Sequence, residues 1–175
     1  MRFGQTFHAK DRLSDNFKLA EFLHSPTAAA RAVPNIPDDE AVVRNLKALV
    51  ENILQPLRSA LHRPVVVTSG YRSHALNSLV GGVSESQHTM GEAADIHVPG
   101  CPWEDVFALI SVMDLPADQL IFENRFQPGF QPVRWLHVSH RRHGHNRREK
   151  RTQVFSQNAQ QTYRQIYEGL FVPSI

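Results

Sequence analysis

The chain has 175 residues, of which 41% are hydrophobic and 21% charged, and its formal net charge is +2 with histidine counted as neutral. This length and composition suit one domain with a packed core, and they argue against global disorder. A single cysteine, Cys101, excludes an internal disulfide framework and a cysteine-rich zinc cluster, and no apolar run reaches the roughly 18 residues that span a bilayer. The unusual feature is the presence of ten histidines, because histidine acts as acid, base or metal ligand near neutral pH.

The pattern of apolar and β-branched residues predicts helices and short strands along the chain. In chain order these are a helix over 14–22, a long helix over 38–57, a strand over 65–68, a helix over 76–80, a strand over 94–98, a helix over 103–113, strands over 119–123 and 135–140, and a helix over 154–170. Pro56 predicts a kink or a division near the end of the long helix. Long helices combined with four or five short strands predict an α+β fold.

A basic segment, residues 140–151, interrupts an otherwise mildly acidic chain. It reads HRRHGHNRREKR, with six Lys or Arg residues against Glu149 and hence a net charge of +5. One interpretation is a solvated, partly mobile loop. The other is a contact surface for an anionic partner, either cell-wall polymer or nucleic acid. No aromatic residue is interleaved in the segment, which argues against binding single-stranded nucleic acid by stacking.

Three polar side chains, His88, Asp95 and His137, form a candidate metal site. Two imidazoles and a carboxylate can hold zinc and leave a fourth position open to water, as catalytic sites do. Asp95 and His137 each lie in a predicted strand, and alternation allows both to point from one face of the sheet while their apolar neighbours are buried. Each histidine alone also fits a hydrogen-bonded structural role, so the residues by themselves leave both interpretations open.

Several motifs together closely resemble the zinc D-Ala-D-Ala carboxypeptidase family, peptidoglycan peptidases that share a fold with the hedgehog signalling domain. The motifs are residues 69–73 (SGYRS), 76–77 (LN), 80–82 (VGG), 86–88 (SQH), 91–95 (GEAAD) and 135–139 (WLHVS). The resemblance implies a small antiparallel sheet flanked by helices. We expect one peptidase domain over 1–175, with its core at about 13–139, the basic segment at 140–151 and a C-terminal helical extension at 152–175.

The resemblance also implies roles for particular residues. The implied ligands of the Zn²⁺ cofactor are His88, Asp95 and His137. Arg72 would take part in catalysis by holding a substrate carboxylate or a peptide carbonyl, and Ser86 would hydrogen-bond the substrate backbone. Trp135, beside the last ligand, would form the floor of the cleft or simply pack.

One position departs from the family pattern. Many members carry the catalytic carboxylate three residues before the last histidine, and here that position is Arg134. Glu123 is the predicted replacement, because its strand should pair near the strand that carries His137, although a surface ion pair is its other interpretation. Asp118 and Glu92 are the alternative acids.

These expectations combine into a zinc peptidase that cuts a peptide bond in peptidoglycan stem peptides, as a carboxypeptidase or an endopeptidase. We expect a monomer, with neither nucleic acid binding nor membrane insertion. The first ten residues lack an apolar run and predict no cleavable secretory signal. A wall hydrolase made in the cytoplasm would then be a phage or prophage lysin released through a separate pore. The alternative is an inactive zinc-containing module that binds wall or a protein partner, which the arginine at 134 supports.

Overall fold

Helices and strands are mixed along the chain in the computed structural model, which describes residues 7–157 and 162–173. The helices are α1 (Leu19–Leu23), α2 (Pro26–Ala30), α3 (Glu40–Leu49), α4 (Gln55–Leu61), α5 (His74–Leu79) and α6 (Trp103–Val112), with a π-helical turn, η1 (Val50–Leu54), between α3 and α4. The strands are β1 (Val66–Ser69), β2 (Ala93–His97), β3 (Gln119–Phe126), β4 (Val133–Ser139), β5 (Glu149–Gln157) and β6 (Thr162–Glu168). The predicted α+β class is confirmed.

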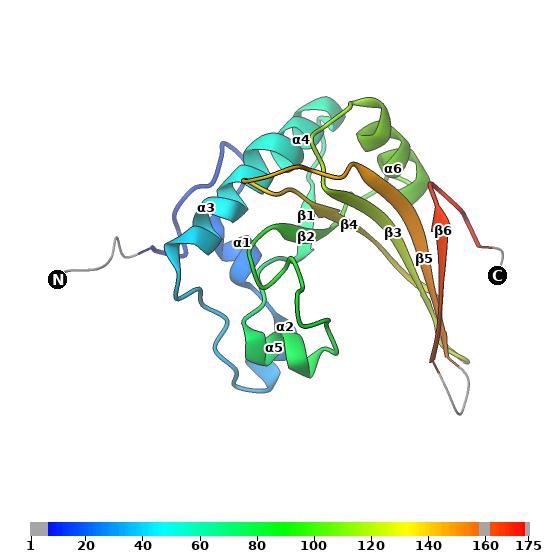
Figure 1. Cartoon of the computed structure of the whole chain (residues 1–175), viewed down its shortest axis with the longest axis horizontal. Coiled ribbons are helices and arrows are strands. Elements are labelled where there is room, and N and C mark those ends of the chain that lie inside the picture. Colours follow the sequence, from blue (N-terminus) through cyan, green and yellow to red (C-terminus); the bar gives the residue numbers. More distant parts are fainter. Residues whose placement is uncertain (1–6, 158–161, 174–175) are drawn as a thin grey trace.

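All of these strands belong to one sheet, in the order β1-β2-β4-β3-β5-β6. Neighbouring strands run antiparallel except β3 and β5, which run parallel. The antiparallel prediction is therefore correct for β1 to β4 and wrong for the pairing of β3 with β5. Residues 140–148 connect β4 to β5 across the start of β3, and in Figure 1 the curved sheet ends at β6.

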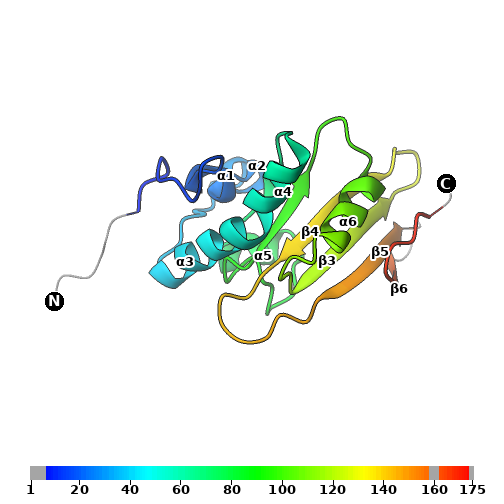
Figure 2. The ribbon, with the colours of Figure 1, turned by 90° about the horizontal axis from the view of Figure 1, so that it is seen from above.

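The helices cover one face of this sheet and form the hydrophobic core with it. Alternating side chains of β2, β3 and β4 point to that face and are at most 1% exposed, namely Ala94, Ile96, Leu120, Phe122, Leu136 and Val138. They join one buried cluster with apolar residues of α3, η1, α4 and α6. Figure 2 shows α3, α4 and α6 on the same side of the strands. The opposite face is left for the polar side chains of the same strands.

The predicted long helix is divided into α3, η1 and α4, and it continues to Leu61. Pro56 is the second residue of α4, directly after the π-helical turn. Proline has no N–H to donate to the preceding turn, so the wider turn before it accommodates the missing hydrogen bond. Within the described ranges, no helix combines the length and the apolar character needed to cross a membrane.

Over residues 152–157 and 162–173, the part that the structure describes, the predicted helix at 154–170 and the helical extension at 152–175 are wrong. The chain forms a hairpin there, because β5 pairs with β3 on one side and with β6 on the other. Thr152 and Val154 are buried on the core side of β5, at 0% and 7% exposed, whereas Gln153 between them lines the cleft on the opposite face. This alternation with β-branched and aromatic residues is typical of a strand, and tertiary pairing outweighs the weak helical pattern.

Candidate active site

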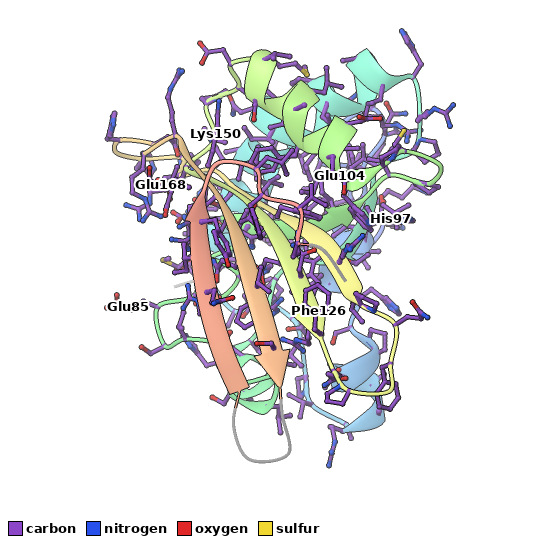
Figure 3. All side chains as sticks on the ribbon, turned by 90° about the vertical axis from the view of Figure 1, so that its right-hand side faces the viewer. Glu85, His97, Glu104, Phe126, Lys150 and Glu168 are labelled. Carbon is purple, nitrogen blue, oxygen red and sulfur yellow. The ribbon has the colours of Figure 1, made fainter. Side chains whose placement is uncertain are left out.

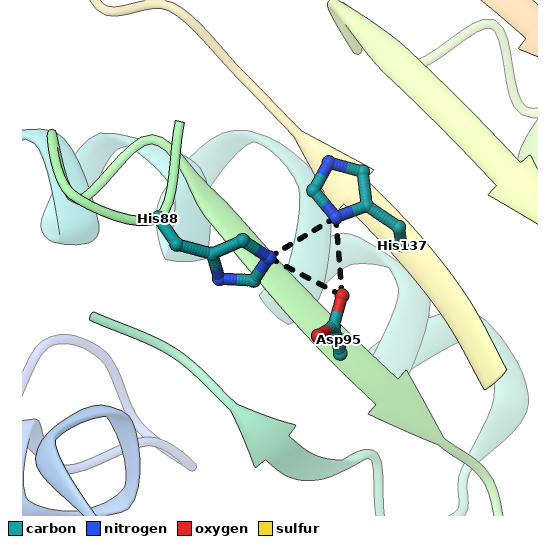
Figure 4. Close-up of side chains that lie close together, drawn as sticks. All are labelled: His88, Asp95 and His137. Atoms are coloured by element: carbon teal, nitrogen blue, oxygen red, sulfur yellow. Dashed lines mark hydrogen bonds and ion pairs between the residues drawn. The ribbon is translucent and has the colours of Figure 1, made fainter. Parts of the chain in front are cut away.

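Three elements bring the predicted metal ligands together. His88 lies in the loop between α5 and β2, Asp95 lies in β2 and His137 lies in β4. Asp95 and His137 are direct register partners on the antiparallel pair β2–β4, so both side chains leave the same face of the sheet. Figure 4 shows the ring of His88 reaching this pair from its loop. The structure thus places all three predicted residues in one buried group.

The backbone around Gly70 fixes the ring of His88. The His88 Nδ1 atom lies 2.7 Å from the Gly70 carbonyl oxygen, so Nδ1–H donates there and Nε2 faces the other two side chains with its lone pair. A Cβ atom at Gly70 would lie 2.6 Å from the backbone of Phe22, which leaves room for glycine alone. Gly91 has a φ of +72° and sits equally close to α3, where a side chain would be strained.

The three donor atoms form a nearly equilateral triangle. Asp95 Oδ1 lies 3.3 Å from His88 Nε2 and 3.1 Å from His137 Nδ1, and the two nitrogens are 3.2 Å apart. Tetrahedral zinc with ligand bonds of about 2.0–2.1 Å requires donor separations of about 3.3 Å, so the group fits this ion. Burial would raise the pKa of Asp95, but the two imidazoles outweigh it and lower that pKa, which keeps the carboxylate ionised.

Arg72 contacts the second oxygen of the same carboxylate. Its Nη2 atom lies 2.7 Å from Asp95 Oδ2, and its Nε donates to Ser69 Oγ at 3.0 Å. The guanidinium therefore leaves Oδ1 for the donor triangle and fixes the carboxylate orientation, as groups behind metal ligands commonly do. Arg72 also lines the cleft, so the predicted contact with substrate stays compatible with this position.

Glu123 faces the same side of the sheet as the donor triangle. It pairs in register with Trp135 on β4, two residues before His137, and with Gln153 on β5. Burial raises the pKa of Glu123, while His137 and the nearby guanidinium groups oppose the rise and Asp95 adds to it. Within the described residues, its carboxylate has no ion pair or hydrogen bond, so the surface ion pair interpretation is not supported.

The two alternative acids are engaged elsewhere. Asp118 is fully buried and accepts hydrogen bonds from Arg147 and from Gln87 Nε2. Burial would raise its pKa, but the contacts with Arg147 and Arg141 lower the pKa to about 2. Glu92 accepts a hydrogen bond of 3.4 Å from the same glutamine side chain. Among these three acids, Glu123 is therefore the one that faces the donor triangle and forms no ion pair or hydrogen bond within the described residues.

A cleft of about 1,470 Å³ opens above the donor triangle. The loop after α5 forms one wall, and it contributes Ser86, a predicted substrate-binding residue that is 8% exposed. Trp135, the other such residue, lies on the sheet side of the cleft. Both positions are compatible with contact to a bound peptide.

The basic segment is held against the body of the protein by several of its arginines. Arg141 and Arg147 contact Asp118, Arg148 pairs with Asp114, and the Arg142 Nε donates to Asn45 at 3.1 Å. Residues 149–151 belong to β5 and not to a loop. Most of residues 141–148 are nevertheless exposed, so the segment is solvated, and its internal pairing leaves less free charge for an anionic polymer.

The sequence reasoning missed the residues that line the far side of the cleft. Gln153 and Phe155 of β5 and Arg164 of β6 all border it, together with Arg125 of β3. The local signal for a strand is weak here, because residues 149–157 read EKRTQVFSQ and do not alternate polar with apolar residues. The parallel partner β3, which stabilises β5 as a strand, cannot be recognised from the local sequence.

A buried His–Asp–His triangle with a neighbouring carboxylate in a cleft is an arrangement that metal-dependent hydrolases use. A family model described as peptidase M15 matches residues 15–125, and the chain belongs to that family. Over 44 residues, 25% of this chain, the sequence is 48% identical to the zinc D-Ala-D-Ala carboxypeptidase of Streptomyces albus G. That match spans 17% of the length of the relative. The family and the donor set together indicate Zn²⁺ as the metal, in agreement with the predicted cofactor.

Proposed function

We propose that the protein is a zinc peptidase that hydrolyses a peptide bond in peptidoglycan stem peptides. The observation that carries this proposal is the donor triangle of His88, Asp95 and His137 at the base of a cleft that also holds an unpaired carboxylate, Glu123. Membership of the M15 family supports a peptide substrate. The name of the Streptomyces relative supports a cell-wall peptide, with cleavage as a carboxypeptidase or an endopeptidase.

In such a reaction, each of the side chains around the cleft has a separate role. Bound Zn²⁺ supplies a Lewis acid that polarises a carbonyl and brings the pKa of its water to about 7. The Glu123 carboxylate takes the proton of the attacking water and returns it to the leaving amine. Arg72 orients Asp95 and presents its remaining N–H groups to the substrate, and Ser86 and Trp135 contact the peptide. No covalent intermediate with the protein is required.

Cleavage of purified cell wall tests this proposal. The zinc-loaded protein should release soluble peptides, chelation should stop the release, and added Zn²⁺ should restore it. The His137→Ala variant should lose both zinc and turnover, whereas His62→Ala, at the exposed C-terminal end of α4, is the matched control that should keep both. Cleavage that survives chelation, or full turnover in His137→Ala, would contradict the proposal. Mass spectrometry of the released fragments identifies the bond.

The second candidate is a catalytically inactive module that holds zinc and binds wall or a protein partner. The arginine at position 134, where many relatives carry an acid, favours it. The Glu123→Gln variant separates the two candidates, because an enzyme loses turnover and keeps zinc, whereas a binding module has no turnover to lose. Wall binding by the wild-type protein without release of any peptide would support the second candidate.

Release of the enzyme as a phage or prophage lysin is a further part of the proposal. It predicts host lysis when the protein is co-expressed with a pore-forming membrane protein. Equal lysis without the pore-forming protein would count against it.

A further inference from the structure

The wall of the cleft formed by β5 and β6 lies outside the part of the chain that matches the M15 family. Both strands follow residue 125, where the match ends. They contribute Phe155 and Arg164 to the lining of the cleft. Figure 3 shows the two strands side by side, with β5 next to β3. The match to the family model therefore assigns no role to this wall.

The guanidinium group of Arg125 is held at this wall between two aromatic rings. Its central carbon lies 5.5 Å from the centre of the Trp135 ring on β4 and 5.7 Å from the centre of the Phe155 ring on β5. Cation–π contacts of this kind restrict the guanidinium while leaving its charge and its N–H groups free. Arg125 is thus presented in a fixed place at the cleft surface.

Arg164 adds a second positive charge in the same row of side chains. It is the register partner of Phe155, which is in turn the register partner of Arg125. Register partners on adjacent strands place their side chains on one face at a separation of about 5 Å. The row across β3, β5 and β6 is therefore arginine, phenylalanine, arginine.

Neither of these two arginines is neutralised. Within residues 7–157 and 162–173, neither Arg125 nor Arg164 forms an ion pair with an acidic side chain, whereas Arg151 on the same face is paired with Glu149. Exposed arginines are often simply solvated. Here the two charges border the cleft that holds the donor triangle, so they create a positive potential where a substrate binds.

We propose that Arg125, Phe155 and Arg164 form a subsite that binds a carboxylate group of the peptide substrate, beside the bond that is cut. The proposal rests on the proposed function and specifies its substrate as an acidic peptide. Guanidinium groups recognise carboxylates by paired, charge-assisted hydrogen bonds, and the ring of Phe155 packs against the adjoining methylene groups. Stem peptides offer two sources of this group: the α-carboxylate of the γ-linked glutamate, and the second carboxylate of a diamino acid at the third position.

Paired synthetic stem peptides test the subsite in the zinc-loaded full chain. One peptide carries both carboxylates, one has both amidated, and two more have a single carboxylate amidated. Dissociation constants from calorimetry and steady-state cleavage kinetics are measured for the wild type, Arg164→Gln, the charge-conserving Arg164→Lys and a matched control, Arg31→Gln. Arg31 is an exposed arginine at the end of α2 and does not line the cleft.

The subsite predicts that Arg164→Gln weakens binding of the acidic peptide about fivefold at low salt, because an exposed charge pair contributes up to about 1 kcal/mol. The dissociation constants of the fully amidated peptide for Arg164→Gln and for the wild type should agree within about twofold. For the acidic peptide, Arg164→Lys should restore part of the lost affinity, and Arg31→Gln should bind as the wild type does. One of the two singly amidated peptides should bind Arg164→Gln and the wild type with equal dissociation constants. The carboxylate that is amidated in that peptide is the one that the subsite binds. Equal loss for acidic and amidated peptides, or loss for neither, would overturn the subsite. Absence of cleavage by the wild type would instead overturn the proposed function, and the dissociation constants would still decide the subsite.

Discussion

The start of β3 and its middle each carry an acidic side chain, and the two lie in opposite environments. Asp118, directly before the strand, would have its pKa raised by burial, yet Arg147 and Arg141 lower that pKa to about 2. Glu123, within the strand, has burial as the main influence on its pKa, and the pKa is raised. A neutralised carboxylate fixes structure, whereas a desolvated and unpaired one beside the three metal-donor side chains can exchange a proton.

The largest expected effect is the loss of kcat when Glu123 is replaced, compared with the loss when Asp118 is replaced. Glu123→Gln should lower kcat about 10²- to 10⁴-fold, because proton transfer by a positioned side chain contributes this much. Zinc content and peptide binding should stay near the wild-type values, because Glu123 is not a member of the donor triangle. Asp118→Asn is the matched amide variant, and its kcat should fall less than about tenfold, since its contact nearest the donor triangle is the indirect one through Gln87, the chain neighbour of His88. A larger loss in Asp118→Asn than in Glu123→Gln would reverse the assignment.

The pH dependence of kcat/KM should report the pKa of Glu123. The base acts as a carboxylate, so kcat/KM should fall on the acid side as Glu123 becomes protonated, and this limb should vanish in Glu123→Gln. The positive charge of Arg125 lowers the pKa of Glu123. Arg125→Gln should therefore raise that pKa and move the acid limb to higher pH, while Arg31→Gln leaves it in place. An acid limb that does not move in Arg125→Gln would place the titration on another group.

The acid at the start of β3 should have its main effect on stability. A carboxyl whose pKa is lowered by folding stabilises the folded state above its unfolded value near 3.8, and this contribution is lost as the pH falls through about 2. Asp118→Asn should therefore lower the free energy of unfolding by about 1–2 kcal/mol at pH 7, after allowance for solvent screening of the arginines. Denaturant titrations at pH 7 and pH 2 measure the difference between variant and wild type. It should shrink at the lower pH, and a difference independent of pH would contradict the ion-pair explanation.

The donor triangle was predictable from sequence because each ligand lies in a short local motif, and strand alternation placed Asp95 and His137 on one face. The position of Glu123 beside that triangle was also predictable, because its strand was expected to pair near β4, whereas its role as the catalytic acid stays a prediction. The C-terminal hairpin was not predictable in the same way. Its first strand, β5, pairs through its backbone with β3, from which β4 and residues 140–148 separate it in the chain, and such a parallel pairing between distant strands leaves little local signal. The role of the basic segment depended on Asp118, a partner more than twenty residues earlier in the chain.

The smallest expected effect concerns Arg134, the position at which the resemblance to the family leads one to expect the catalytic acid. Arg134 alternates with His137 along β4 and pairs in register with Asn124, a fully buried residue on the core side, so only part of Arg134 borders the cleft. A carboxylate at this position therefore points away from the donor triangle in this strand. Arg134→Glu combined with Glu123→Gln should show no more turnover than Glu123→Gln alone, with zinc content and melting temperature confirming that the double variant is folded. Recovery of turnover in the double variant would contradict this expectation. It would show that a side chain at position 134 can reach the metal site, and that Glu123 is needed only because position 134 lacks a carboxylate.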